Sequence, residues 1–201
     1  MRWAGSYVPV PLVLDEGSFD GLEWMLTRAL PGVNATAPEL LRDPHRLVPI
    51  LAAGLRTFHE ALPVEVCPFD FRVARALEHV NQRLATGAID FDRDLHPEHR
   101  HLDRAGLLAE LQRLRPATED LVVCHGDYCL PNVLIQGGRV TGFVDLGELG
   151  VANRWWDLAV ATWSVTWNLG PGWEDAFLHA YGVPRDDSRI AFYRILYDLA
   201  S

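Results

Sequence analysis

The sequence predicts a mostly helical α+β fold in which small pairs of β-strands are inserted at two places. Apolar residues recur every three or four positions over several long stretches, which is typical of amphipathic helices. Short apolar runs bounded by glycine-containing turns lie at the N-terminus and in the second half of the chain, and these are typical of β-hairpins. With 201 residues, 49% of them hydrophobic and 22% charged, the chain can form one substantial core or two small lobes.

Composition limits the classes of partner. The balance of 18 basic and 27 acidic residues gives a net charge of −9, which repels nucleic acid and attracts cationic small molecules. No apolar run is long enough for a membrane span, so no membrane partner is expected. Three cysteines without a zinc-site spacing favour a reducing cytoplasm. All the basic residues are arginine, because the chain contains no lysine.

The N-terminal segment is expected to be a β-hairpin. Residues 7–14 include two prolines, which exclude a helix and favour an edge strand. Turn residues follow, and residues 22–30 form a second apolar run that ends at Pro31 and Gly32. A hairpin of this length is too small to be a domain by itself.

Three helices are expected next. Apolar spacing predicts one from Pro44 to Pro63 and two more over residues 69–84 and 102–114. The polar residues 90–101 between the last two are expected to form a surface loop. This loop contains three histidines, but their spacing matches no standard zinc motif, which favours a solvated loop over a metal site.

The pattern then changes to strands. Residues 121–124 form a short strand, followed by a polar loop and by a hairpin of residues 133–135 and 139–144 around two glycines. Cys124 is expected to be a buried strand residue. From Arg154 onward the pattern is helical again.

The loop and the hairpin carry the residues with the clearest chemistry. A short hairpin brings Asp127, Asn132 and Asp145 to one edge, where their oxygens suit Mg²⁺. Kinase-type phosphoryl transfer uses such a set: one aspartate accepts the proton, while the asparagine and an Asp-x-Gly aspartate hold the metal. The spacing of Asp127 and Asn132 alone is common, but its combination with the hairpin is more specific. A metal-dependent hydrolase is the weaker alternative, because the sequence shows no further ligands.

The same stretch resembles the aminoglycoside phosphotransferases, a family of antibiotic kinases related to protein kinases. The similarity runs from residues 122–127 through Gly-Phe-Val-Asp at 142–145 to residues 157–159. Residues 67–70 and 189–194 resemble the 3′-phosphotransferase branch in particular. The resemblance implies a protein-kinase-like fold with a mostly helical C-lobe and small catalytic β-hairpins.

The resemblance also implies ATP and Mg²⁺ as cofactors and assigns roles to individual residues. Asp127 is the implied catalytic base, and Asn132 and Asp145 are the implied metal ligands. His125 is expected to orient the loop rather than to transfer protons. Asp157 would hydrogen-bond the backbone of the catalytic loop, although a carboxylate that favours a helix N-terminus remains an equal alternative.

A division of the chain follows from the same resemblance. Residues 1–32 would be a vestigial nucleotide-binding N-lobe with its hinge, and residues 33–201 the C-lobe with the catalytic loop and substrate cleft. Thr27, Arg28 and Ala29 would pair with adenine through their backbone, unless they simply end a strand. The family's lysine strand has no counterpart here, so no lysine can contact the α- and β-phosphates.

The departures from the family concentrate in the substrate cleft. Glu148, Trp163 and Asp198 are the expected substrate contacts, although the spacing of Trp163 also fits core packing. The expected activity is transfer of the γ-phosphoryl group of ATP to a hydroxyl of a small molecule, first of all an aminoglycoside-like one. The alternative is a non-catalytic kinase-like binding module or a truncated fragment without turnover, which the missing lysine favours. The sequence does not specify an oligomeric state.

Overall fold

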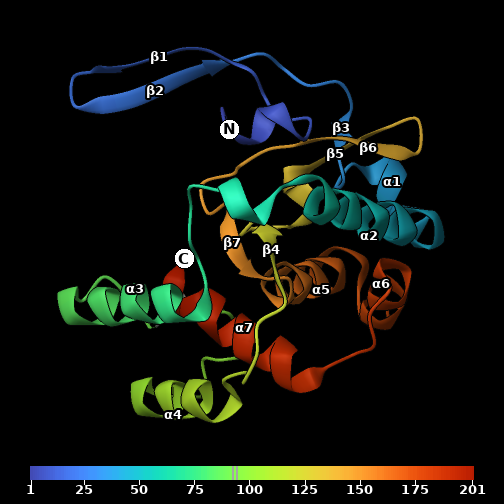
Figure 1. Cartoon of the computed structure of the whole chain (residues 1–201). Helices are drawn as coiled ribbons and strands as arrows, with labels where there is room; N and C mark the ends of the chain where they lie inside the picture. Colours follow the sequence, from blue (N-terminus) through green and yellow to red (C-terminus); the bar gives the residue numbers. More distant parts are fainter. Residues whose placement is uncertain (92, 94) are drawn as a thin grey trace.

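The computed structural model shows a helical body that carries three small antiparallel sheets (Figure 1). It describes residues 1–91, 93 and 95–201, so Asp92 and Asp94 of the expected surface loop lie outside the described residues. The helices are α1 (Pro38–Leu41), α2 (Pro44–Ala61), α3 (Val73–Thr86), α4 (Arg104–Leu114), α5 (Trp155–Leu169), α6 (Glu174–Tyr181) and α7 (Asp187–Ala200). The strands are β1 (Val13–Phe19), β2 (Leu22–Thr27), β3 (Val33–Asn34), β4 (Leu121–Cys124), β5 (Val133–Gln136), β6 (Arg139–Phe143) and β7 (Gly150–Asn153). The predicted mostly helical α+β class is confirmed.

The three sheets have different surroundings. β1 and β2 form a hairpin that projects from the helical body (Figure 1), and nearly all of its side chains are exposed. β5 and β6 form the expected second hairpin, and β3 extends it on the β5 side. β4 pairs with β7 in a fully antiparallel register from Leu121 opposite Asn153 to Cys124 opposite Gly150.

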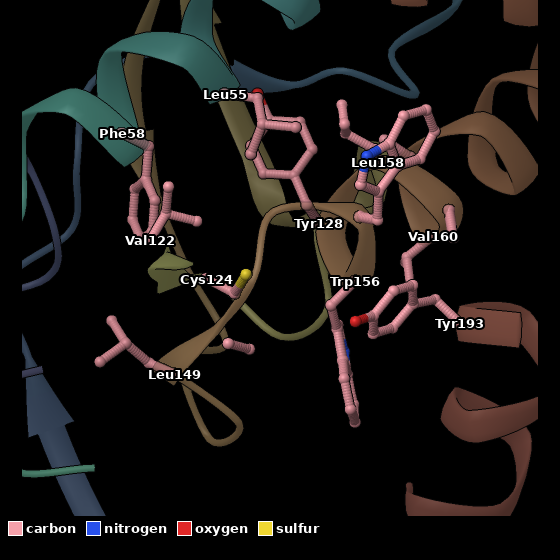
Figure 2. Close-up of a cluster of buried hydrophobic side chains, with 14 of the residues drawn as sticks. Leu55, Phe58, Val122, Cys124, Tyr128, Leu149, Trp156, Leu158, Val160 and Tyr193 are labelled. Carbon is pink, nitrogen blue, oxygen red and sulfur yellow. The ribbon is translucent and has the colours of Figure 1, made fainter. Parts of the chain in front are cut away.

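The core lies around β4 and α5. Every residue of α5 from Trp155 to Val165 is buried, and such an all-round apolar helix belongs in the interior. Figure 2 shows the side chains of α2, β4, α5 and α7 that gather here, including Phe58, Cys124, Trp156 and Tyr193. The polar loop that follows β4 is therefore anchored in the buried core of the molecule.

Local sequence explains the long helices. α2 begins where Asp43 accepts a hydrogen bond from Arg46 N at 3.2 Å, with Pro44 in the first turn, and it ends just before Pro63. α4 begins in the same way, because Asp103 accepts from Gly106 N at 2.8 Å. α3 begins at Val73, later than predicted, and its first N–H donates to Glu119 from the segment before β4.

Two expectations for irregular segments were wrong in part. The N-terminal strand begins at Val13 and not at residue 7, because the preceding stretch contains Pro9 and Pro11 and packs Val8 and Val10 into the core. The segment 90–101 is not simply a solvated loop, since Leu95 and His99 are buried. Within the described ranges, none of the helices combines the length and apolar character that crossing a bilayer requires.

Candidate active site

A buried carboxylate fixes the loop of residues 125–132, which we call the catalytic loop. Asp157, in the first turn of α5, is fully buried. It accepts hydrogen bonds from His125 N at 2.7 Å and from Gly126 N at 2.9 Å. Trp156 Nε1 donates to Gly126 O at 2.8 Å, so both the N–H and the carbonyl group of Gly126 are hydrogen-bonded to α5. The structure thus places the Asp157 carboxylate against the backbone of the loop.

A second layer of polar groups supports Asp157, and sequence reasoning missed it. His59 of α2 contacts Asp157 Oδ2 through Nε2 at 2.9 Å, and its Nδ1 lies 2.8 Å from the hydroxyl of Tyr181. Arg154 donates to the same hydroxyl at 3.1 Å. Cys124 Sγ also lies close to His59 and Asp157, but burial raises the pKa of this thiol far above its ordinary value. Its Sγ donates to Asn153 O at 3.3 Å, so the thiol is engaged with the backbone of β7.

The anchored loop brings two of its own residues, Asp127 and Asn132, close to Asp145, which follows β6. Asn132 Nδ2 donates to Asp127 Oδ2 at 2.8 Å and to the Asp127 carbonyl at 3.0 Å. Val144 N donates to Asn132 O at 3.0 Å, which ties the end of β6 to the loop and brings Asp145 next to it. Because the Asn132 amide nitrogen faces Asp127, its amide oxygen is free to face a metal ion.

Backbone geometry shows how tightly the site is built. Asp145 has φ = 57°, the left-handed region that a residue with a side chain rarely adopts. Gly126 has φ = 91°, and a Cβ atom there would collide with the carbonyl of Glu148. Such strained positions persist only where the surroundings determine them, and they concentrate at functional sites.

Electrostatics single out Glu148, three residues after Asp145. This carboxyl is half-buried, and Ser201 Oγ donates to its Oε2 at 3.3 Å. Burial, with a smaller contribution from the charge of Asp127, raises the pKa of Glu148 to about 7. A cationic group nearby would therefore favour its ionised form.

The structure also brings Tyr197 and Ser164 to the site, and neither was expected from the sequence. The Tyr197 hydroxyl donates to Asp127 Oδ1 at 3.0 Å, and Ser164 Oγ accepts from Leu130 N at 2.8 Å. Both contacts join residues more than thirty positions apart, so spacing along the chain gives no signal for them.

Two of the three expected substrate residues are engaged inside the protein. Asp198 is 6% exposed, and its Oδ2 accepts from His96 N and contacts His99 Nδ1 at 2.6 Å. This carboxylate of α7 binds the segment that precedes α4, whereas the sequence led us to expect it in contact with the substrate. Trp163 is 2% exposed and donates through Nε1 to Glu98. This position agrees with the alternative that Trp163 packs in the core. Its stacked neighbour Trp167 is 52% exposed.

The three expected hinge residues lie where β2 leaves the hairpin. Thr27 is the last residue of β2, and Arg28 and Ala29 follow it and are exposed. Arg28 N donates to Leu12 O at 2.9 Å, which closes the base of the hairpin. The Pro31 carbonyl then accepts from the Thr141 hydroxyl at 2.7 Å, so this connection is tied to β6.

Comparisons with known proteins agree with this geometry. The family model described as "Phosphotransferase enzyme family" matches residues 1–193. An aminoglycoside 3′-phosphotransferase of Streptomyces fradiae is 42% identical over 205 residues, which cover 98% of this chain and 75% of the relative. The crystal structure of a type VIII aminoglycoside-3′-phosphotransferase has a TM-score of 0.83 at 36% identity, covering 98% of this chain and 76% of that one.

A further similar structure was solved with ligands bound. It is the aminoglycoside phosphotransferase APH(3″)-Id of Streptomyces rimosus in complex with ADP and streptomycin. Its TM-score is 0.80 at 31% identity, with 96% of this chain and 76% of that chain covered.

The fold and the matches define the class of protein as a phosphotransferase with a protein-kinase-like fold, so the predicted class of enzyme is confirmed. Within this class, the chain belongs to the aminoglycoside phosphotransferase family. It matches about three quarters of the length of these relatives.

Proposed function

We propose that this chain transfers the γ-phosphoryl group of ATP to a hydroxyl group of an aminoglycoside-like molecule. The observation that carries the proposal is the 2.8 Å hydrogen bond from Asn132 Nδ2 to Asp127 Oδ2. It leaves the Asn132 amide oxygen available to a metal ion, and Asp127 Oδ1, which accepts from Tyr197, would be the oxygen that takes the proton. The relatives named above act on or bind aminoglycosides, and one of them binds ADP.

The donor set fits Mg²⁺. An amide oxygen from Asn132 and the exposed carboxylate of Asp145 are hard oxygen ligands of the kind that Mg²⁺ binds beside nucleotide phosphates. When bound, the ion neutralises developing charge on the phosphates. The protein holds Asp145 in its left-handed conformation next to Asn132, so the two ligands are arranged before the ion arrives.

Asp127 is the proposed general base. Its carboxylate is fixed by Asn132, and the loop that carries it is fixed by Asp157. It would accept the proton of the attacking hydroxyl as the phosphoryl group is transferred, and a positioned base typically contributes a factor of about 10² to 10⁴.

Charge around the base suits a cationic sugar. Glu148 is half-buried close enough to Asp127 for the two charges to interact, and the chain has a net charge of −9. An ammonium group of the acceptor would neutralise Glu148 and offset the cost of its ionisation. We assign a substrate-binding role to Glu148, and to Trp167 in place of the enclosed Trp163.

Nucleotide binding is assigned to the other side of the site. Residues 1–32 would belong to the nucleotide-binding N-lobe and its hinge, and residues 33–201 would form the C-lobe. The backbone of Thr27, Arg28 and Ala29 would pair with adenine through groups other than Arg28 N, which donates to Leu12 O, and the last two residues are exposed. A reducing cytoplasm suits the three free cysteines, and no nucleic-acid or membrane partner is proposed.

The test is phosphate transfer from γ-labelled ATP with Mg²⁺. Three acceptors are compared. The first is streptomycin, the second is another aminoglycoside that has a free 3′-hydroxyl, and the third is the 3′-deoxy form of that second aminoglycoside. We expect Asp127→Ala to lower transfer by a factor of about 10² to 10⁴ while nucleotide binding remains. Asp175→Ala, an exposed carboxylate in the first turn of α6 that pairs with Arg185 at the surface, is the matched control and should transfer like the wild type. Equal rates for Asp127→Ala and the wild type would refute the assignment of the base.

One observation favours a second candidate, a binding module without turnover: the sequence contains no lysine to contact the α- and β-phosphates. Thermal unfolding with ATP and Mg²⁺ separates the two. Ligand at a hundred times its Kd stabilises the folded state by about 2.7 kcal/mol. A stabilisation that is lost in Asp145→Ala supports the enzyme, whereas a folded chain with no shift and no transfer supports the module.

A further inference from the structure

The hydroxyl of Tyr197 donates to Asp127 Oδ1, the oxygen of the proposed base to which Asn132 Nδ2 does not donate. Asp127 Oδ2 already accepts from Asn132 Nδ2 at 2.8 Å. Asp127 Oδ1 accepts from the Tyr197 hydroxyl at 3.0 Å, which is within the range of an O–H···O hydrogen bond. The tyrosine therefore donates to the proposed base as an incoming hydroxyl group would.

Packing holds Tyr197 in this position. It lies near the end of α7, it is half-buried, and its ring meets Trp163 edge-on with 6.4 Å between centroids. Trp163 in turn is enclosed by its stacked neighbour Trp167 and by Arg194, whose guanidinium lies 5.1 Å from its ring centroid. The edge-on contact with Trp163 therefore helps to hold the Tyr197 hydroxyl against Asp127.

The Tyr197 hydroxyl keeps its proton. Burial and the negative charges of Asp127 and Glu148 raise the pKa of Tyr197 well above its ordinary value. The group is therefore a donor at neutral pH, and it satisfies a carboxylate oxygen that would otherwise bind water.

We infer that Tyr197 is a positioning and specificity-determining residue, which covers Asp127 Oδ1 until the hydroxyl of an acceptor displaces it. A water molecule that replaced the tyrosine would only exchange one hydrogen bond to Asp127 for another. A large polyhydroxylated cation that also neutralises Glu148 gains enough to do so. Tyr197 would thus restrict transfer to acceptors that fill the cleft and would suppress hydrolysis of ATP in their absence. The inference rests on the proposed function of Asp127.

The first experiment compares the wild type with Tyr197→Phe, which keeps the ring and removes the hydroxyl. The matched control is Tyr193→Phe, one turn earlier on α7, whose ring packs against Trp156 and Phe192. For Tyr197→Phe we expect ATP hydrolysis without acceptor to rise about tenfold, and KM for the acceptor to fall by up to about tenfold with a smaller change in kcat. Tyr193→Phe should change neither the rate of ATP hydrolysis without acceptor nor the KM for the acceptor. A merely structural Tyr197 would lower both activities together, and that result, or no difference from the wild type, would overturn the inference.

The second experiment reads the hydrogen bond without any turnover. NMR of the protein labelled in its tyrosine rings should show a slowly exchanging Tyr197 hydroxyl proton, assigned by its loss in Tyr197→Phe. Its exchange should become fast in Asp127→Ala and when streptomycin is added. Slow exchange that is unchanged in Asp127→Ala would overturn the inference.

Together the experiments distinguish the inference from the proposed function. If phosphate is transferred but Tyr197→Phe matches the wild type in hydrolysis and KM, the inference fails and the function stands. If the hydroxyl responds to Asp127→Ala and to streptomycin but no phosphate is transferred to any acceptor, the proposed function fails and the covering role stands. Phosphate found on Tyr197 itself by mass spectrometry would overturn the inference, because the tyrosine would then be an acceptor.

Discussion

The catalytic loop and the β1–β2 hairpin are both short segments, but different interactions hold them. The loop makes hydrogen bonds to buried groups of other elements, of which Asp157 and Trp156 are the clearest examples. The hairpin is held by its own ladder and exposes large apolar side chains, among them Phe19 at 78% and Leu22 at 73%. The hydrogen bonds that fix the loop of the proposed base thus come from α5, and we expect changes in the hairpin to have little effect on them.

The largest expected effect is the difference in unfolding free energy between a substitution that weakens the catalytic loop and one in the hairpin. Asp157→Ala should lower the free energy of unfolding by about 3 to 5 kcal/mol, because it leaves the buried N–H groups of His125 and Gly126 without an acceptor. Urea denaturation measures this value. Asp15→Ala in β1, whose exposed carboxylate accepts from Glu16 N, should change it by less than about 0.5 kcal/mol. Similar losses for the two variants would remove the contrast.

Two glycines provide the next comparison, because both have positive φ. Gly126→Ala adds backbone strain and a collision with the Glu148 carbonyl, so we expect a loss of about 3 kcal/mol. Gly21→Ala, in the hairpin turn at φ = 76° with open space around it, should lose only about 1 kcal/mol. Thermal or urea unfolding of the two variants tests the difference, and equal losses would show that the close approach at Gly126 is not rigid.

A pH dependence is expected from Glu148 in the metal-free protein. Its pKa is raised from 4.5 to about 7 in the folded state, so the folded protein holds this proton more tightly than the unfolded chain does. The contribution of Glu148 to stability therefore falls as the pH rises from about 4.5 to 7, by about 2 to 3 kcal/mol, and is level above pH 7. Denaturation curves at pH 5 and pH 8 should differ between the wild type and Glu148→Gln by this amount, and parallel behaviour would contradict the assignment.

The smallest effect is expected in the hairpin. Phe19→Thr keeps a strand-forming residue and removes an exposed ring, so stability should change by less than about 0.5 kcal/mol. Self-association measured by sedimentation should decrease, because exposed apolar surface on an edge strand promotes it. A loss above about 1 kcal/mol would mean that the hairpin packs on the body more firmly than its exposure indicates.

Sequence alone predicted the features that depend on neighbouring residues. α2 followed from its apolar spacing and from the prolines at its two ends. The convergence of Asp127, Asn132 and Asp145 followed from a short hairpin, because the residues that set it lie within one local motif. Here local spacing and three-dimensional contact coincide.

The missed features depend on distant partners. β7 has only four residues and exists as a strand because β4 pairs with it. The contact of Tyr197 with Asp127 joins residues 70 positions apart, and that of His59 with Asp157 joins residues 98 apart. Asp198 was expected in the substrate cleft, but packing turns its carboxylate toward His99, and no pattern in one sequence reveals that rotation.

The pairing of β4 with β7 has a consequence for how such a protein can be altered. Cys124 lies opposite Gly150, so the chain leaves the core and returns to it at neighbouring points of one ladder. Everything between them, from the proposed base to Glu148, forms a cassette whose two ends are held at a fixed separation. A related cassette with the same ends could be exchanged as a unit, and the chemistry of the molecule could diversify without a redesign of the helices that support it.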